Sequence, residues 1–116
     1  MTVLLYELNE EMRLFRRTVR DFSEQVIRPQ VDHLWETGEF PYDIVKQMGE
    51  LGILGIPWPE EYGGAGGDYL AYAIAVEEIA RVDGSCAITV EAHISLGSSP
   101  FYYYGSEEQK QEWLVP

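Results

Sequence analysis

The adjacent carboxylates Glu77 and Glu78 are the first residues in this sequence that could serve as a general acid and a general base. Both fall within a predicted helix over residues 69–82. Neighbouring helix positions point about 100° apart, so the two side chains would not converge on one substrate. We therefore expect both carboxylates to lie in solvent.

The histidines and the single cysteine offer little further chemistry. His33 and His93 fall in different predicted helices, with no second ligand at metal-binding spacing, so no metal site is predicted. His33 is expected at the surface or as a satisfied core residue. For His93, a catalytic role is possible, but a buried, hydrogen-bonded role is favoured. Cys86 could have a lowered pKa near a helix start, although an inert buried thiol is favoured, and one cysteine fits a reducing compartment.

A glycine-rich run, LGILGIPWPEEYGGAGGD over residues 51–68, joins two predicted helices. Its GGAGGD part lacks the Lys-Ser/Thr pair of a phosphate-binding loop, and no strand precedes it. Gly52 and Gly55 are predicted to take left-handed backbone, and the prolines to hold residues 56–59 extended. We favour a packed structural connector over a loop that also touches a ligand.

Charge is distributed unevenly along the chain. The net charge of −12 arises within residues 31–116, which carry fifteen acidic and three basic side chains. Nucleic acid and anionic membrane surfaces are therefore poor partners. Four arginines recur at helical spacing near the start: Arg13, Arg16, Arg17 and Arg20. They could bind an anion, but we favour a solvated face paired with Glu10, Asp21 and Glu24.

Apolar periodicity predicts an all-α fold in a single domain, residues 1–116, with five or six helices. The predicted helices span about residues 10–26, 29–36, 41–51, 69–82, 86–96 and 107–114. Pro29 is predicted to break or kink the first helix near Val26 to Arg28, and Gly97 to Pro100 to interrupt the fifth before a short helical piece at 101–104. Predicted N-caps are Asn9, Asp68, Ser85 and Ser106, the last in a capping box with Gln109. Trp35, Leu51 and Leu96 are assigned to apolar faces. Val3 to Tyr6 is the one weak strand candidate.

No targeting signal is predicted from the sequence. Met1 to Tyr6 is apolar, but no basic residue precedes it, and acidic residues follow at once. The longest apolar run, Tyr69 to Val76, is too short to span a membrane. We therefore expect a cytoplasmic protein without membrane insertion.

Three stretches together resemble the acyl-CoA dehydrogenase family. They are LGILGIPWPEEYGGAGGDYLAYAIAVEEIARVDGS (Leu51 to Ser85), SLGSSP (Ser95 to Pro100) and YGSEEQKQEWLVP (Tyr104 to Pro116). The opening NEEMRLFRRTVRDFSEQVIRPQVD looks like the first helices of that family. The resemblance implies the orthogonal-type helical bundle of the family's N-terminal domain, with the middle β-domain and the C-terminal helical domain absent.

The resemblance implies a FAD-dependent oxidation of acyl-CoA thioesters to trans-2-enoyl-CoA. A glutamate takes the α-proton and the flavin N5 takes the β-hydride. In the family, the base and most flavin contacts lie in the other two domains. We therefore expect no catalytic or cofactor-binding residue in this chain, no tight binding of FAD and no activity of the chain alone. The implied partners are acyl-CoA, electron-transfer flavoprotein and the other two domains.

The resemblance also implies a small contribution to substrate binding. In the family, the segment before Ser-Leu-Gly forms the closed end of the acyl-chain pocket, which by position points to Ala92, His93 and Leu96. His93 is polar where an apolar wall is expected. An alternative function is a stand-alone helical module that self-associates, as a possible homo-oligomer, or binds another protein, since missing domains would expose apolar surface.

Overall fold

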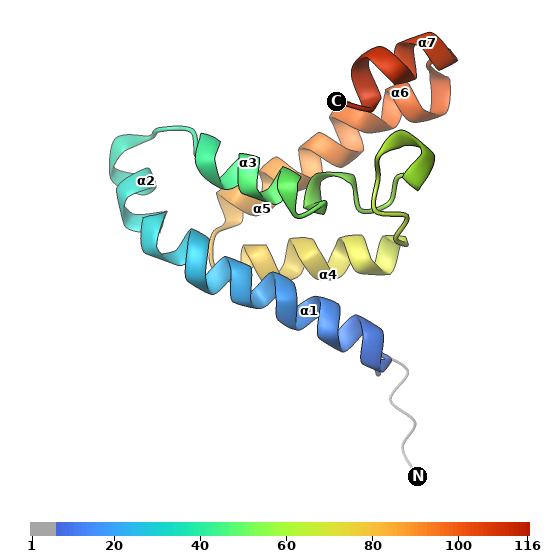
Figure 1. The fold of residues 1–116 in the computed structure, drawn as a ribbon. Coiled ribbons are helices and arrows are strands. Elements are labelled where there is room, and N and C mark those ends of the chain that lie inside the picture. Colours follow the sequence, from blue (N-terminus) through green and yellow to red (C-terminus); the bar gives the residue numbers. More distant parts are fainter. Residues whose placement is uncertain (1–6) are drawn as a thin grey trace.

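The computed structural model describes residues 7–116, and every regular element in that range is helical (Figure 1). The all-α prediction is confirmed, while Val3 to Tyr6 lies outside the described residues. The α-helices are α1 (Glu10–Phe22), α2 (Val31–Thr37), α3 (Tyr42–Glu50), α4 (Tyr69–Ala80), α5 (Gly84–Ala92), α6 (Ser99–Tyr104) and α7 (Glu107–Gln109). Among these residues, no helix is both long and apolar enough to cross a membrane.

Side-chain caps fix where the helices begin. The Asn9 side chain accepts a hydrogen bond from the Met12 amide, and Asp68 accepts one from the Ala71 amide, both at 2.8 Å, as predicted. The capping box of Ser106 and Gln109 is also confirmed.

The predicted cap at Ser85 is wrong. The Asp83 carboxylate accepts a hydrogen bond from the Cys86 amide at 2.9 Å, so α5 begins at Gly84. Asp83 is as good a capping residue as serine and lies two positions earlier, which places Ser85 inside the first turn.

Two predicted breaks are continuous helical turns instead. A π-helical turn (Ser23–Ile27) and a 3-10 turn (Arg28–Gln30) carry α1 into α2 past Pro29. A second π-helical turn (His93–Ser98) carries α5 into α6, with Pro100 in the first turn of α6. Both prolines lie near the start of a new helical segment, where the missing N–H costs no hydrogen bond.

Three residues that were assigned to apolar helix faces lie at the surface. Trp35 is 88% exposed, Leu51 is 56% exposed and Leu96 is 73% exposed, so the predicted burial of Trp35 and the inward assignment of the other two are wrong. Apolar spacing predicts which side of a helix is apolar, but it does not show whether another element covers that side.

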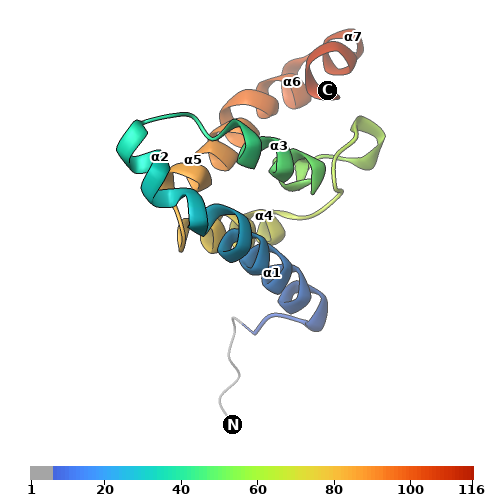
Figure 2. The ribbon, with the colours of Figure 1, turned by 60° about the vertical axis from the view of Figure 1, so that its left-hand side comes forward.

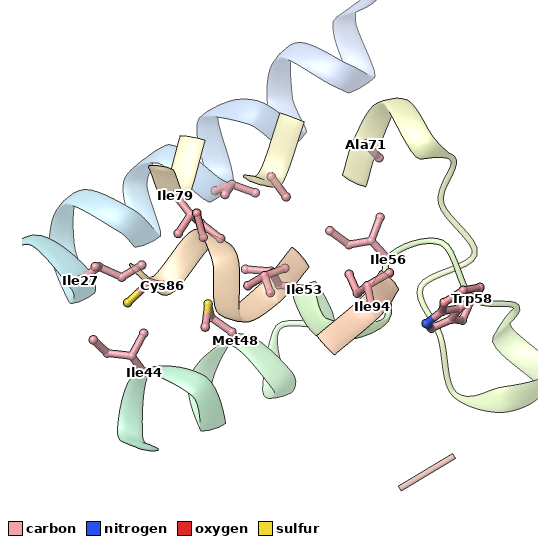
Figure 3. Close-up of a cluster of buried hydrophobic side chains, with 14 residues drawn as sticks. Ile27, Ile44, Met48, Ile53, Ile56, Trp58, Ala71, Ile79, Cys86 and Ile94 are labelled. Carbon is pink, nitrogen blue, oxygen red and sulfur yellow. The ribbon is translucent and has the colours of Figure 1, made fainter. Parts of the chain in front are cut away.

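The core forms between two thin layers of helices. Helix α1 lies alongside α4, and α5 packs against α4, while α3 covers the other side (Figures 1 and 2). Figure 3 shows the buried cluster, to which Ile27, Ile44, Met48 and Ile79 contribute from three segments. The body measures 49 × 45 × 19 Å, so its shortest dimension is about two helix diameters.

The connector over residues 51–68 is packed, as predicted, but its backbone differs from the prediction. Gly52 has φ +78°, whereas Gly55 is not left-handed, and Ile56 has helical angles (φ −48°, ψ −52°) instead of an extended backbone. The loop folds back on itself, and a Cβ on Gly64 would lie 2.1 Å from the carbonyl oxygen of Trp58. This close approach requires glycine at position 64.

Glu78 is a buried ion-pair centre, which overturns the predicted solvent exposure. The residue is 1% exposed. Arg20 of α1 donates to both of its carboxylate oxygens, at 2.8 and 2.9 Å, and Arg81 donates to Oε2 at 3.0 Å. Helical periodicity predicts where Glu78 lies around the axis of α4. It does not predict that Arg20 of another helix lies opposite this side chain.

The arginine face is exposed, as predicted, but the predicted pairing of these arginines with Glu10, Asp21 and Glu24 is wrong for the described residues. Arg20 pairs across helices with Glu78, while Glu24 pairs with Arg28 and Arg13 pairs with Glu7. The hydrogen bond from Arg20 is the main reason that the pKa of Glu78 is lowered, although burial opposes it. The carboxylate thus stays ionised at neutral pH.

We expect Glu78→Gln to lower the free energy of unfolding by about 2 kcal/mol, measured by urea denaturation at pH 7. A fully buried pair would cost more, but the side chains of Arg20 and Arg81 remain 45% and 43% exposed. The matched control is Glu77→Gln, which changes the exposed neighbour and should stay within about 0.5 kcal/mol of wild type. Equal effects of the two substitutions would contradict the buried pair.

The same pair predicts a pH dependence. Because the folded pKa of Glu78 lies below its ordinary value of 4.5, its contribution is complete above that value. It is lost as the pH falls through the lowered folded pKa. Urea titrations at a series of pH values should show the difference between wild type and Glu78→Gln shrinking below about pH 4.5. A difference that grows on acidification would contradict the assigned sign.

Candidate functional site

The segment that the sequence singled out spans the end of α5 and the π-helical turn His93–Ser98. Val90 and Ile94 point into the core, at 0% and 1% exposure. Ala92 is half-buried, and Leu96, four residues on, is exposed. The i,i+4 spacing places Ala92 and Leu96 on one outward face. Ile88, four residues before Ala92 and 59% exposed, extends that face.

His93 lies on a different side of the same segment. Its side chain lines a hollow of about 210 Å³ together with Trp58, Tyr62 and Trp113, whereas Ala92 and Leu96 do not line it. The residue is exposed and its ring makes no hydrogen bond to another described residue, so the favoured buried, hydrogen-bonded role is wrong. Burial of part of the ring lowers the pKa of His93, so the imidazole is neutral at pH 7.

The other two candidate residues, His33 and Cys86, lie in surroundings that indicate a structural role. His33 is exposed, with Nε2 3.3 Å from Oε2 of Glu39. Cys86 is fully buried, as predicted, and burial together with a hydrogen bond to Asp83 raises the pKa of its thiol to about 12. Within residues 7–116, no group of three or more His, Cys, Asp or Glu side chains could hold a metal ion.

A larger hollow between α1 and α4 was not predicted. Its volume is about 600 Å³, and its floor is apolar, formed in part by Met12, Leu70 and Ile74. The apolar stripes of both helices were recognised in the sequence. The space between α1 and α4 depends on the angle at which the two helices cross. This angle cannot be predicted from the apolar periodicity of one helix.

The described residues do not fit a complete FAD site. The polar groups around the 600 Å³ hollow include the carboxylates of Glu7, Glu77 and Glu78 and one guanidinium, that of Arg16. The pyrophosphate of a dinucleotide is anionic and needs donors or positive charge around it. No step of flavin chemistry is therefore assigned to these residues.

Comparison with known proteins defines the class of this chain. Residues 9–116 match the model described as acyl-CoA dehydrogenase, N-terminal domain. The chain therefore belongs to the acyl-CoA dehydrogenase family and corresponds to its N-terminal helical domain.

Individual relatives and solved structures agree with this family assignment. A probable acyl-CoA dehydrogenase of Bacillus subtilis is 51% identical over 111 residues, which are 96% of this chain and 29% of that protein. Butyryl-CoA dehydrogenase from Megasphaera elsdenii superposes with a TM-score of 0.88 at 35% identity, over 97% of this chain and 30% of that one. A chain from the structural study of the electron transferring flavoprotein of Acidaminococcus fermentans superposes with a TM-score of 0.91 at 38% identity. The match covers 97% of this chain and 30% of that one. The chain thus spans about 30% of the length of these relatives.

The environment of Cys86 predicts its reactivity. With a thiol pKa of about 12 and no exposed surface, Cys86 should react with iodoacetamide at pH 8 at least about 100-fold more slowly in the native chain than in urea. Mass spectrometry of the alkylated protein measures both rates. Fast native alkylation would contradict the buried thiol.

Proposed function

We propose that this domain works within a FAD-dependent acyl-CoA dehydrogenase, which converts acyl-CoA thioesters to trans-2-enoyl-CoA. The flavin, which accepts the hydride, and the catalytic base would be held by the family's other two domains. Support comes from the family match over residues 9–116. The relatives described as acyl-CoA dehydrogenases and as butyryl-CoA dehydrogenase favour an acyl-CoA substrate.

Within that enzyme, we assign the closed end of the acyl-chain pocket to the segment containing Ala92, His93 and Leu96. The observation that carries this assignment is the outward apolar face of α5 and the following π-helical turn. Leu96 projects from this face at 73% exposure, beside the small side chain of Ala92. Exposed leucine next to alanine suits contact with an aliphatic chain once the other domains enclose it. His93 would border this wall from the side of the smaller hollow.

Electron-transfer flavoprotein is the proposed redox partner of the whole enzyme. The structural similarity to a chain studied with the electron transferring flavoprotein of Acidaminococcus fermentans supports this choice. The domain itself would contribute shape and packing, because positioning of cofactor and substrate is the protein's share of such catalysis.

The isolated 116-residue chain should be inactive. With FAD and butyryl-CoA added, reduction of an artificial electron acceptor should not exceed a blank that contains FAD alone, because the proposal places the base and flavin site in other domains. Turnover above the blank would overturn this assignment. A folded chain, verified by circular dichroism, is the required control.

The pocket assignment is tested in a protein that carries this domain together with the middle and C-terminal domains. Leu96→Ala should shift the chain-length preference of kcat/KM toward longer acyl chains. For the chain length that meets the wall, we expect kcat/KM to change by about tenfold, since one or two methylenes are worth about 1–3 kcal/mol. Leu14→Ala is the matched control, because Leu14 is also exposed, at 63%, but lies on α1. An unchanged chain-length profile in Leu96→Ala would remove Leu96 from the pocket.

A further inference from the structure

The 600 Å³ hollow between α1 and α4 lies on a side of α4 that the sequence predicts to be covered. Every side chain from Tyr69 to Val76 is apolar or aromatic, so this part of α4 is apolar all round. A helix of that kind is normally buried on all sides. Yet Leu70 is 49% exposed and Ala73 is exposed, and both line the hollow. An apolar cover over this part of α4 is therefore expected.

The rim of the hollow favours an uncharged cover. Of the ionised side chains that border it, Glu7 and Glu78 already form ion pairs with arginines. The other two, Arg16 and Glu77, carry opposite charges, so the rim as a whole is close to neutral. Burying an unpaired charge there would be costly, whereas an apolar segment would lose no favourable contact with water.

The chain itself enters the hollow from its N-terminal side. Leu8 is half-buried and lines the hollow. Glu7 is held beside α1 by Arg13, whose Nη2 donates to its Oε1 at 2.7 Å. Asn9, the N-cap of α1, has extended backbone angles, φ −67° and ψ 172°. The residues that precede Glu7 are thus joined directly to the rim of the hollow.

These preceding residues include an apolar segment of suitable length. Val3 to Tyr6 has no charged side chain. Four extended residues span about 13 Å. The part of α4 that lines the hollow, from Leu70 to Glu77, is about 10 Å long. A segment joined to the rim is present there at a high effective concentration, which favours it over a separate partner.

The alternation of side chains in extended backbone indicates which residues of the segment would face the hollow. Successive side chains point to opposite sides. Leu8 is half-buried in the hollow, whereas the side chain of Glu7, at the rim, is 65% exposed. In an extended segment, Leu4 and Tyr6 share the side of Leu8, and Leu5 shares the side of Glu7.

We propose that residues 3–6 of this chain cover the hollow between α1 and α4 as an extended segment. Leu4 and Tyr6 pack on its apolar floor, which includes Met12 and Ile74, and Leu5 faces outward. The hollow is then an intramolecular docking site for the chain's own lead-in, and it does not bind a separate ligand. This proposal is independent of the acyl-chain pocket assigned to the end of α5.

Oxidation of Met12 by hydrogen peroxide tests this cover in the 116-residue chain, because Met12 lies in the hollow. The double variant Leu4→Ser/Tyr6→Ser should be oxidised at Met12 at least about threefold faster than wild type, measured by mass spectrometry of peptides. Met48, at 0% exposure, is the internal reference for loss of the fold. An unchanged rate at Met12 would overturn the proposal.

The matched control is Val3→Ser/Leu5→Ser, which removes two apolar side chains from the opposite side of the same segment. It should leave the oxidation rate of Met12 at the wild-type value. Equal acceleration by the two double variants would show that the segment has no fixed side toward the hollow, which contradicts the proposed docking.

A nuclear Overhauser spectrum of the wild-type chain decides the proposal even if a variant fails to fold. We expect cross-peaks between the ring protons of Tyr6 and the methyl groups of Met12 or Ile74. The absence of these cross-peaks would exclude the docked segment. In a mixture of labelled and unlabelled chains, cross-peaks between the two kinds of chain would mean that a second copy fills the hollow, which also overturns the proposal.

A polypeptide that continues into the middle and C-terminal domains distinguishes the segment from a cover supplied by another domain. In that polypeptide, Leu4→Ser/Tyr6→Ser should accelerate the oxidation of Met12 by the same factor as in the 116-residue chain. No acceleration there would assign the cover to another domain and end the proposal, while leaving the proposed role in an acyl-CoA dehydrogenase unaffected.

Discussion

The arrangement of this domain depends on the buried carboxylate of Glu78. It is the one acidic side chain in the described residues that is almost fully buried, and it receives three hydrogen bonds from the guanidinium groups of Arg20 and Arg81. Arg20 reaches it from a helix 58 residues away in sequence. A buried carboxylate without such donors would be strongly unfavourable, so the pair fixes how α1 lies against α4. The hydrophobic cluster then fills the space that this arrangement leaves on the side of α3 and α5 (Figure 3).

The thinness of the body explains why so much apolar surface stays outside. A slab 19 Å thick has few positions that are covered on both sides. Ile88 and Leu96 on the second layer, like Trp35 at the α2 end, are therefore exposed although the core is well packed. Membership of the acyl-CoA dehydrogenase family gives a reason for the face of Ile88 and Leu96, because the proposed role of this domain is to pack on further domains.

Local rules predicted the all-helical fold, the approximate positions of the helices and most caps from sequence, since capping and periodicity depend on residues three or four apart. They failed where the outcome depended on a distant element. Glu78 was assigned to solvent because its partner Arg20 lies on another helix. Leu96 was assigned to an apolar face, but no described element covers it or Ile88 on the same face. Asp83 replaced Ser85 as a cap because two good capping residues lie close together. The indole nitrogen of Trp58 is buried without a hydrogen-bond partner among the described residues, which depends on loop packing that local sequence rules do not predict.

We propose that neighbouring domains cover the outward face of Ile88, Ala92 and Leu96. Hydroxyl-radical footprinting tests this claim most directly, by comparing the 116-residue chain with a polypeptide that continues into the middle and C-terminal domains. We expect oxidation of Leu96 to fall at least about fivefold in the longer polypeptide, while the exposed Leu14 on α1 serves as the internal reference. Equal oxidation of Leu96 in both proteins, with both folded, would contradict it.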